Sequence, residues 1–174
     1  NSVELDNSPY IKGILELFSA DNVQRLKQNN IRIVFAPHHV IAHRFKNIML
    51  DGVDVVTNQE DISYWKGIRI KQGGSASIKN AEVSGSKRGV VVEKGASLVI
   101  KESLLSKNEI GLHVFGSCEI EDVEISENKE YGIKEEKNCE EITVLGTNKI
   151  TENEVDWYDW NDGVLTEEEI TNRE

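Results

Sequence analysis

Three of the four histidines in the sequence stand close together, at His38, His39 and His43. Neutral imidazole is a common ligand of transition metals, so this cluster is a candidate metal site. On a strand, alternate side chains share a face, which places His39 with His43 and turns His38 to the other side. Two ligands on one face need a third from a loop to hold an ion. The alternative interpretation is a set of polar residues at the edge of a strand.

Acidic residues near the C-terminus offer a second kind of chemistry. Residues 159–163 are similar to the start of an EF-hand calcium loop, but their spacing is one residue short. With Gly163 in the sixth position, Tyr158 and Trp160 fall where oxygen ligands belong. We therefore expect no EF-hand geometry and no required cofactor. Incidental Ca²⁺ binding is the remaining prediction for this segment, among Asp156, Asp159 and Asp162.

Aromatic residues beside charged ones indicate a third kind of chemistry, the non-covalent binding of sugars. Flat aromatic faces stack on sugar rings, and charged neighbours select uronates or hydroxyls. The aromatic candidates are Tyr64, Trp65, Phe115, Trp157, Tyr158 and Trp160, and their polar partners are Arg69, His113 and Lys134. Alternatively, each tryptophan closes an end of the hydrophobic core. Their roles depend on the elements that carry them.

Those elements belong to a repeat. The glycines at 67, 89, 111 and 132 are spaced by 22, 22 and 21 residues, which is the signature of a solenoid. Each copy holds three short runs of alternating apolar residues with no helical period between them. The chain must therefore coil, so that each strand pairs in parallel with its equivalent one turn later, roughly 4.8 Å away. Small and polar residues, Asn108 and Asn128 among them, fall at the corners, where asparagine tolerates left-handed backbone and its amide can bond a neighbouring turn.

The repeats also carry a family resemblance. The segments LSKNEIGL at 105–112 and ISENKEYGI at 125–133 resemble right-handed parallel β-helix proteins of the pectate-lyase-like superfamily. WKGIRI at 65–70 and IKGILEL at 11–17 look like opening coils of its bacterial cell-surface members. The resemblance covers residues 11–155 and implies an all-β, right-handed parallel β-helix of about 22 residues per coil. It also implies an extracellular or cell-surface location. The superfamily includes lyases, glycosidases, adhesins and plain scaffolds.

Stacking predicts two columns of outward-facing side chains. The first is Arg69, Val91, His113, Lys134 and Tyr158, and the second is Lys71, Glu93, Phe115, Glu136 and Trp160. The lyases of this superfamily imply a carboxylate cluster that holds Ca²⁺ beside a basic residue, and the glycosidases imply paired carboxylates. Glu93 and Glu136 lie two turns apart, roughly 10 Å, so neither column meets either pattern. A lyase or glycosidase is therefore the alternative to a non-catalytic module.

Charge is distributed unevenly along the chain, whose net charge is −11. Residues 1–107 contain 15 Lys/Arg and 11 Asp/Glu, whereas residues 108–174 contain 5 and 20. In a solenoid, sequence position is height along the axis, so one end is mildly basic and the other strongly acidic. A nucleic-acid groove would need a continuous basic stripe, so nucleic acid is not an expected partner. Head-to-tail self-association is compatible with the asymmetry, as is simple solubility.

The two cysteines, Cys118 and Cys139, lie 21 residues apart, which is one turn of the coil. Equivalent positions in adjacent turns point the same way, so both side chains could lie in the core one rung apart. Two buried thiols that behave as small hydrophobic groups are one interpretation, and a disulfide is the other.

A single domain, residues 1–174, is expected from the length. We predict an N-terminal cap and first coils over 1–36, β-helix coils over 37–155, and a C-terminal cap or exit linker over 156–174. In the first segment, Ser19 or Asp21 could cap a short helix that carries Val23 and Leu26 on one face. In the last, Thr166 followed by three glutamates predicts a helix start.

Together these observations favour a structural or adhesive module that binds polysaccharide, or another cell-envelope component, on one flank. No run of 18 apolar residues occurs, so no transmembrane segment is expected. The alternatives are a β-helix lyase or glycosidase and a subunit that assembles head to tail.

Overall fold

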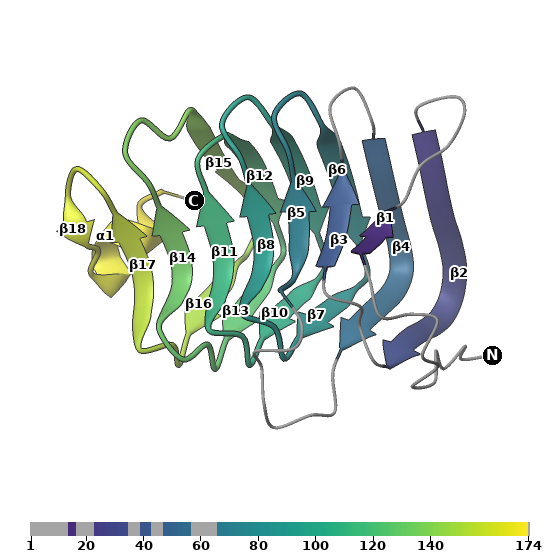
Figure 1. Cartoon of the computed structure of the whole chain (residues 1–174). Coiled ribbons are helices and arrows are strands. Elements are labelled where there is room, and N and C mark those ends of the chain that lie inside the picture. Colours follow the sequence, from purple (N-terminus) through teal and green to yellow (C-terminus); the bar gives the residue numbers. More distant parts are fainter. Residues whose placement is uncertain (1–13, 17–22, 35–38, 43–46, 57–65, 174) are drawn as a thin grey trace.

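The protein is a stack of β-strand turns (Figure 1). The computed structural model describes residues 14–16, 23–34, 39–42, 47–56 and 66–173, with side chains at 50–52 and 66–173. One sheet has eight strands in the spatial order β1 (Ile14–Glu16), β3 (His39–Ala42), β5 (Ile68–Ile70), β8 (Arg88–Val92), β11 (Ile110–Val114), β14 (Tyr131–Glu135), β17 (Val155–Asp159) and β18 (Gly163–Val164).

The other sheet has ten strands and forms the remaining two sides of the coil. Its order is β15 (Glu141–Leu145), β12 (Ser117–Glu121), β9 (Ser97–Lys101), β6 (Ser75–Lys79), β4 (Asn47–Val56), β7 (Glu82–Ser84), β10 (Leu104–Ser106), β13 (Glu124–Ser126) and β16 (Lys149–Thr151), with β2 (Val23–Val34) paired to β4. β4 joins the two sides because it pairs with both β6 and β7. From β5 to β16 the chain makes four turns of three strands each.

Equivalent strands of successive turns pair in parallel, which confirms the predicted parallel β-solenoid. Ile78 pairs in register with Ile100, and Ile100 with Ile120. All three side chains are fully buried, so the core is a vertical stack of aliphatic residues. Leu50 below and Val144 above continue this stack. Burial of such side chains contributes about 1.5–3 kcal/mol each and is the main force holding the turns together.

One corner of the coil is held by a ladder of asparagines, as the repeat predicts. Asn128 Oδ1 accepts hydrogen bonds from the backbone N–H and the side-chain amide of Asn108, at 3.0 and 3.1 Å. The amide of Asn128 donates in turn to the carbonyl of Leu105 and to Asn153 Oδ1. The prediction that the asparagines of this corner adopt left-handed backbone is wrong. The left-handed residues are those preceding the asparagines, such as Lys107 at φ 56°.

The recurring glycine has its physical cause in this ladder. A Cβ at Gly111 would lie 2.7 Å from the carbonyl oxygen of Gly132 and 2.9 Å from the amide nitrogen of Asn128. A Cβ at Gly89 would likewise crowd the side chain of Asn108, and one at Gly132 would crowd that of Asn153. Glycine and asparagine therefore repeat together because each corner has room for only one of the two side chains.

Two local expectations differ from the structure. Val23 and Leu26 lie in β2, a strand paired in parallel with β4, and not in a helix. Inter-strand hydrogen bonds of the second turn override the local helix signal there. Cys118 pairs with Ile142 and not with Cys139, because register partners on β12 and β15 are 24 residues apart and not 21. Both cysteines are free, with Cys118 buried, and burial raises the pKa of the Cys139 thiol to about 12.

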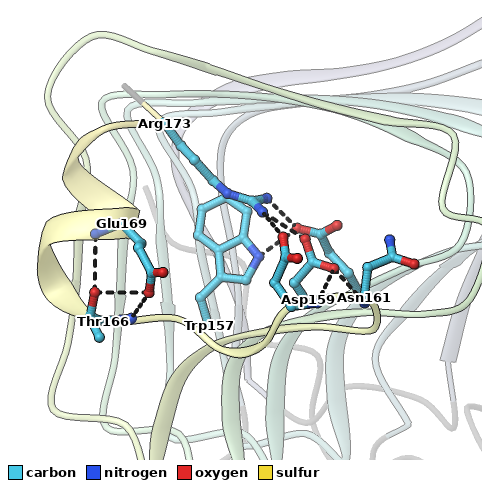
Figure 2. Close-up of polar contacts among 8 residues, drawn as sticks. Trp157, Asp159, Asn161, Thr166, Glu169 and Arg173 are labelled. Atoms are coloured by element: carbon cyan, nitrogen blue, oxygen red, sulfur yellow. Dashed lines mark hydrogen bonds and ion pairs between the residues drawn. The ribbon is translucent and has the colours of Figure 1, made fainter.

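The C-terminal residues pack on the last turn. Thr166 caps α1 (Glu167–Thr171) in a capping box with Glu169, as the sequence predicts, and Figure 2 shows both halves of it. Ile170 of this helix and Leu165 before it belong to the hydrophobic core. Among the described residues, no helix has the length and apolar character that crossing a membrane requires.

Candidate functional site

The outer face of the eight-stranded sheet carries the first predicted column. Arg69, Val91 and His113 are register partners across β5, β8 and β11. The column continues through Lys134 of β14 to Tyr158 of β17. In Figure 1 these strands run side by side along one flank of the stack. Val91 and His113 are buried, so the column presents side chains to solvent at Arg69, Lys134 and Tyr158.

A basic hollow opens on this face at β5 and β8. Its volume is about 480 Å³, within the range of small-molecule sites. We call it the basic hollow, and it is lined by Lys66, Arg69, Lys71, Lys87, Arg88, Val91 and Glu93. Five of these seven side chains are cationic and one is anionic. The site is positive although the chain as a whole is strongly acidic.

Most of these cations have no carboxylate partner within the described residues. Arg69 is the exception, since its Nε lies 2.6 Å from Oε1 of Glu93. Some lysines elsewhere pair with a carboxylate of an adjacent turn: Lys101 bridges Glu119 and Glu121, and Lys149 contacts Glu124. The basic hollow therefore concentrates positive charge, most of which is not paired with a carboxylate of the described residues.

A second hollow adjoins the first. It has a volume of about 360 Å³ and is lined by Arg69, Gln72, Glu93, Lys94 and Phe115. The two hollows share the Arg69–Glu93 ion pair, which stands between them. We call this second site the Phe115 hollow. It supplies an aromatic ring and polar side chains at one place, which is the combination that sugar binding needs.

His113 lies in the predicted column, but its side chain is only 4 % exposed. Its Nε2 lies 2.8 Å from Oε1 of Glu136, and its ring packs against Phe115 with centroids 4.7 Å apart. Burial lowers the pKa of His113, and the nearby charges of Arg88 and Lys134 act in the same direction, which outweighs the hydrogen bond to Glu136. The imidazole is therefore neutral, and it supports the Phe115 ring instead of offering itself to a ligand.

The remaining aromatic candidates are divided between surface and core. Lys134 lies over the ring of Tyr131, 5.2 Å from its centroid, and Tyr131 packs edge-on against Tyr158. Trp160 is 47 % exposed, whereas Trp157 is fully buried at the end of the core. The end-closing interpretation thus describes Trp157 and not Trp160. Tyr64 and Trp65 lie outside the described residues, directly before Lys66 of the basic hollow.

Two of the three aspartates proposed for Ca²⁺ accept hydrogen bonds from protein donors, whereas Asp162 is 66 % exposed and lies 3.8 Å from Arg173. Asp159 accepts hydrogen bonds from Arg173 and from the backbone N–H of Asn161, as Figure 2 shows. Asp156 accepts from the backbone and side chain of Asn153. Within the described part of the chain, no group of three or more His, Cys, Asp or Glu side chains is placed to hold a metal ion. Of the N-terminal histidines, His38 and His43 lie outside that part.

Sequence reasoning missed the members of the basic hollow that stand at the ends of strands. Lys87 and Arg88 enter β8, and Lys66 precedes β5. Lys66 and Arg88 are separated by 22 residues, which is one repeat. That spacing is a signal in the sequence, but the two predicted columns do not include the residues at the start of each strand.

Comparison with known proteins gives one match. The sequence model of the family described as "Right handed beta helix region" matches residues 20–169. Comparison with the curated proteins and with the solved structures gave no match.

Proposed function

Since the chain belongs to the right-handed β-helix family, we propose that it is a rigid, non-catalytic module that binds polysaccharide on the outer face of its eight-stranded sheet. The proposal includes a location outside the cell or at its surface, where polymers of the envelope are accessible. Members of one solenoid family share a scaffold, and function depends on side chains presented by the individual chain.

The observation that carries the proposal is the pair of adjoining hollows that share Arg69 and Glu93. Both hollows are lined by residues from the rungs of β5 and β8, and the Phe115 hollow also reaches the rung of β11, so one ligand can contact both. Phe115, which is partly exposed, offers apolar surface to the face of a sugar ring in the second hollow. The surrounding side chains offer hydrogen-bond donors to hydroxyls.

The same face is less suited to catalysis by carboxylates. Glu93 is held by Arg69, and Glu136 is held by His113 and Lys134. Hydrogen bonding and positive neighbours lower the pKa of Glu136 in spite of its partial burial, so this carboxyl is not a proton donor near neutral pH. A β-helix lyase or glycosidase is for these reasons the weaker proposal.

Head-to-tail assembly is also less well supported. β18 pairs antiparallel with β17 and covers that edge of the eight-stranded sheet. A covered edge works against end-on addition of another parallel coil.

The experiment is a pull-down on insoluble pectin, cellulose and peptidoglycan, followed by titration with soluble fragments of whichever polymer retains the protein. Phe115→Ala should weaken binding about 3- to 10-fold, because a lost aromatic contact is worth on the order of 0.5–1.5 kcal/mol. Val164→Ala is the control, because Val164 is 61 % exposed on β18, away from both hollows. Retention on none of the polymers, or equal affinity of the Phe115 variant and wild type, contradicts the proposal.

A further inference from the structure

The proposed function does not specify the charge of the polysaccharide, and the cations of the basic hollow bear on that charge. Resting on that function, we infer that the basic hollow binds the oxyanion groups of an acidic polysaccharide, whether carboxylate, sulfate or phosphate. The Phe115 hollow then holds the neighbouring sugar ring. The inference concerns charge selection and can fail while polysaccharide binding itself stands.

Five cationic side chains converge on the hollow from two adjacent rungs. Lys66, Arg69 and Lys71 come from β5 and its flanks, and Lys87 and Arg88 come from the rung above. Equivalent backbone positions on these rungs are roughly 4.8 Å apart. Lysine and arginine donors at this spacing can contact one oxyanion from both rungs.

Arg69 is oriented for such a contact. Its Nε donates to Glu93, which fixes the guanidinium plane. In the described structure the two terminal nitrogens of Arg69 carry no hydrogen bond, and a guanidinium presents them as a fork that matches carboxylate and sulfate oxygens. Glu93 thus positions the arginine instead of cancelling the whole site, in which cations outnumber carboxylates five to one.

The acidic remainder of the chain does not cancel this local charge. The acidic part of the chain, residues 108–174, begins on the rung of β11, next to β8, but within the described structure none of its carboxylates forms an ion pair with a cation of the basic hollow. Its last strands, β17 and β18, lie three or more rungs beyond β8, about 14 Å or more along the axis. Exposed charges separated by more than about 10 Å are largely screened at 0.1 M salt. A concave wall of one charge sign also concentrates its own potential. The hollow is therefore attractive to anions in a protein of net charge −11.

The extent of the positive surface favours a glycan over a nucleic acid. The basic hollow spans two rungs, and the next members of the face, Phe115 and the Glu136–Lys134 pair, present no net positive charge. A phosphodiester chain needs a continuous basic track. An acidic polysaccharide needs charge at one sugar and an apolar or hydroxyl-binding surface at the next.

The test uses one glucan in three forms: neutral dextran, carboxymethyl-dextran and dextran sulfate. Affinity gel electrophoresis or calorimetry in 0.1 M salt should show binding to at least one charged form at least about tenfold tighter than to dextran. The two charged forms distinguish carboxylate from sulfate as the preferred group. Inorganic polyphosphate, a polyanion without sugar, should bind more weakly than the better charged dextran.

Two variants of equal charge change localise the effect. Lys87→Gln combined with Arg88→Gln removes two cations from the basic hollow. Lys129→Gln combined with Lys137→Gln removes two exposed cations elsewhere. The first variant should lose about tenfold or more of the affinity for charged dextran, and the second should stay within about twofold of wild type. Thermal unfolding of both confirms that each is folded.

Each contrary result has a separate meaning. Binding to neutral dextran as tight as to both charged forms overturns the inference and leaves the proposed function standing. Equal losses in the two double variants also overturn it, because long-range charge would then explain the binding. Polyphosphate binding as tight as dextran sulfate contradicts the sugar component. If no form of dextran binds while the pull-down retains a neutral polymer, the charge inference fails and the proposed function stands. If the protein binds no polymer in either experiment, the inference and the proposed function both fail.

Discussion

The Nε2 atom of His113 lies 2.8 Å from Oε1 of Glu136, one rung further along the stack. The same ring supports Phe115, which lines the second hollow. Nδ1 of His113 is buried and has no hydrogen-bond partner in the described structure. A neutral imidazole that donates from Nε2 satisfies this arrangement better than an imidazolium, which would bury a second N–H without an acceptor.

Stability should therefore depend on the protonation of His113. The folded pKa of His113 lies below its ordinary value because the ring is buried. The stability that the neutral His113 ring contributes is then fully present above about pH 6.5, and it is lost as the pH falls through the folded pKa. We expect the free energy of unfolding, measured by urea titration between pH 7.5 and 5, to fall with pH in wild type.

His113→Gln should reduce that slope, by up to about 1.4 kcal/mol per pH unit, which is the contribution of one proton. The other histidines titrate in both proteins and cancel in the comparison. Identical slopes in the two proteins would show that His113 is protonated equally in the folded and unfolded states.

Removal of a rung of the asparagine ladder should destabilise the fold. Asn128→Ala leaves the backbone N–H of Asn108 and the carbonyl of Leu105 buried without partners. Each such loss costs about 1–3 kcal/mol, so we expect a total of about 3 kcal/mol by urea unfolding. Asn161→Ala is the control, because the side chain of Asn161 is exposed. A loss below about 1 kcal/mol in the ladder variant would contradict the role of the ladder.

A stabilising variant is available at the same corner. Lys107 has a φ of 56°, which costs an L-residue about 1–2 kcal/mol, whereas glycine adopts this conformation without strain. Lys107→Gly should raise the free energy of unfolding by about 0.5–1 kcal/mol after the entropic cost of glycine. The matched control is Lys129→Gly, at an exposed position that is not left-handed, where the same change should destabilise. Equal effects at the two sites would rule out backbone strain as the cause.

Arg173 joins the C-terminal helix segment to the last turns. It donates to Glu135 and Asp159, and Glu135 also accepts from the indole of Trp157 at 2.6 Å (Figure 2). Arg173→Met would leave two largely buried carboxylates without their cation. Because Arg173 is partly exposed, we expect a loss of about 1–3 kcal/mol near pH 7. Lys137→Met, which removes an exposed cation, should cost little.

The Arg173 effect should also vary with pH. Burial raises the pKa of Asp159, but the hydrogen bonds from Arg173 and from two backbone N–H groups outweigh it, so the folded pKa lies below the ordinary value. The stability that this carboxylate contributes is present above about pH 4 and is lost as the pH falls through the folded pKa. The difference between wild type and Arg173→Met should therefore shrink in acid. A pH-independent difference would indicate lost packing on Trp157, over which the guanidinium lies.

Much of the fold follows from the repeat alone. In a parallel coil, equal sequence spacing becomes equal height, so the glycines at 67, 89 and 111 predicted that Ile78, Ile100 and Ile120 would stack. The same argument placed Arg69, Val91 and His113 in one outward column. Equal spacing fails where a turn changes length, and for that reason Cys118 meets Ile142 and not Cys139.

By itself the sequence determined which residues lie above one another, because strand pairing in a solenoid is set by a local, repeating pattern. Only the tertiary structure decided which of those residues are exposed on the surface. His113 and Phe115 are both outward in the pattern, yet packing against Phe115 on the same rung and Glu136 on the next rung buries His113. Likewise, Lys66, Lys87 and Arg88 join Arg69 around one hollow because strand ends of adjacent turns converge there. The spacing places Lys66 one repeat from Arg88. Burial and the shape of the hollow depend on side-chain contacts across the stack, and the spacing of residues along the chain does not encode those contacts.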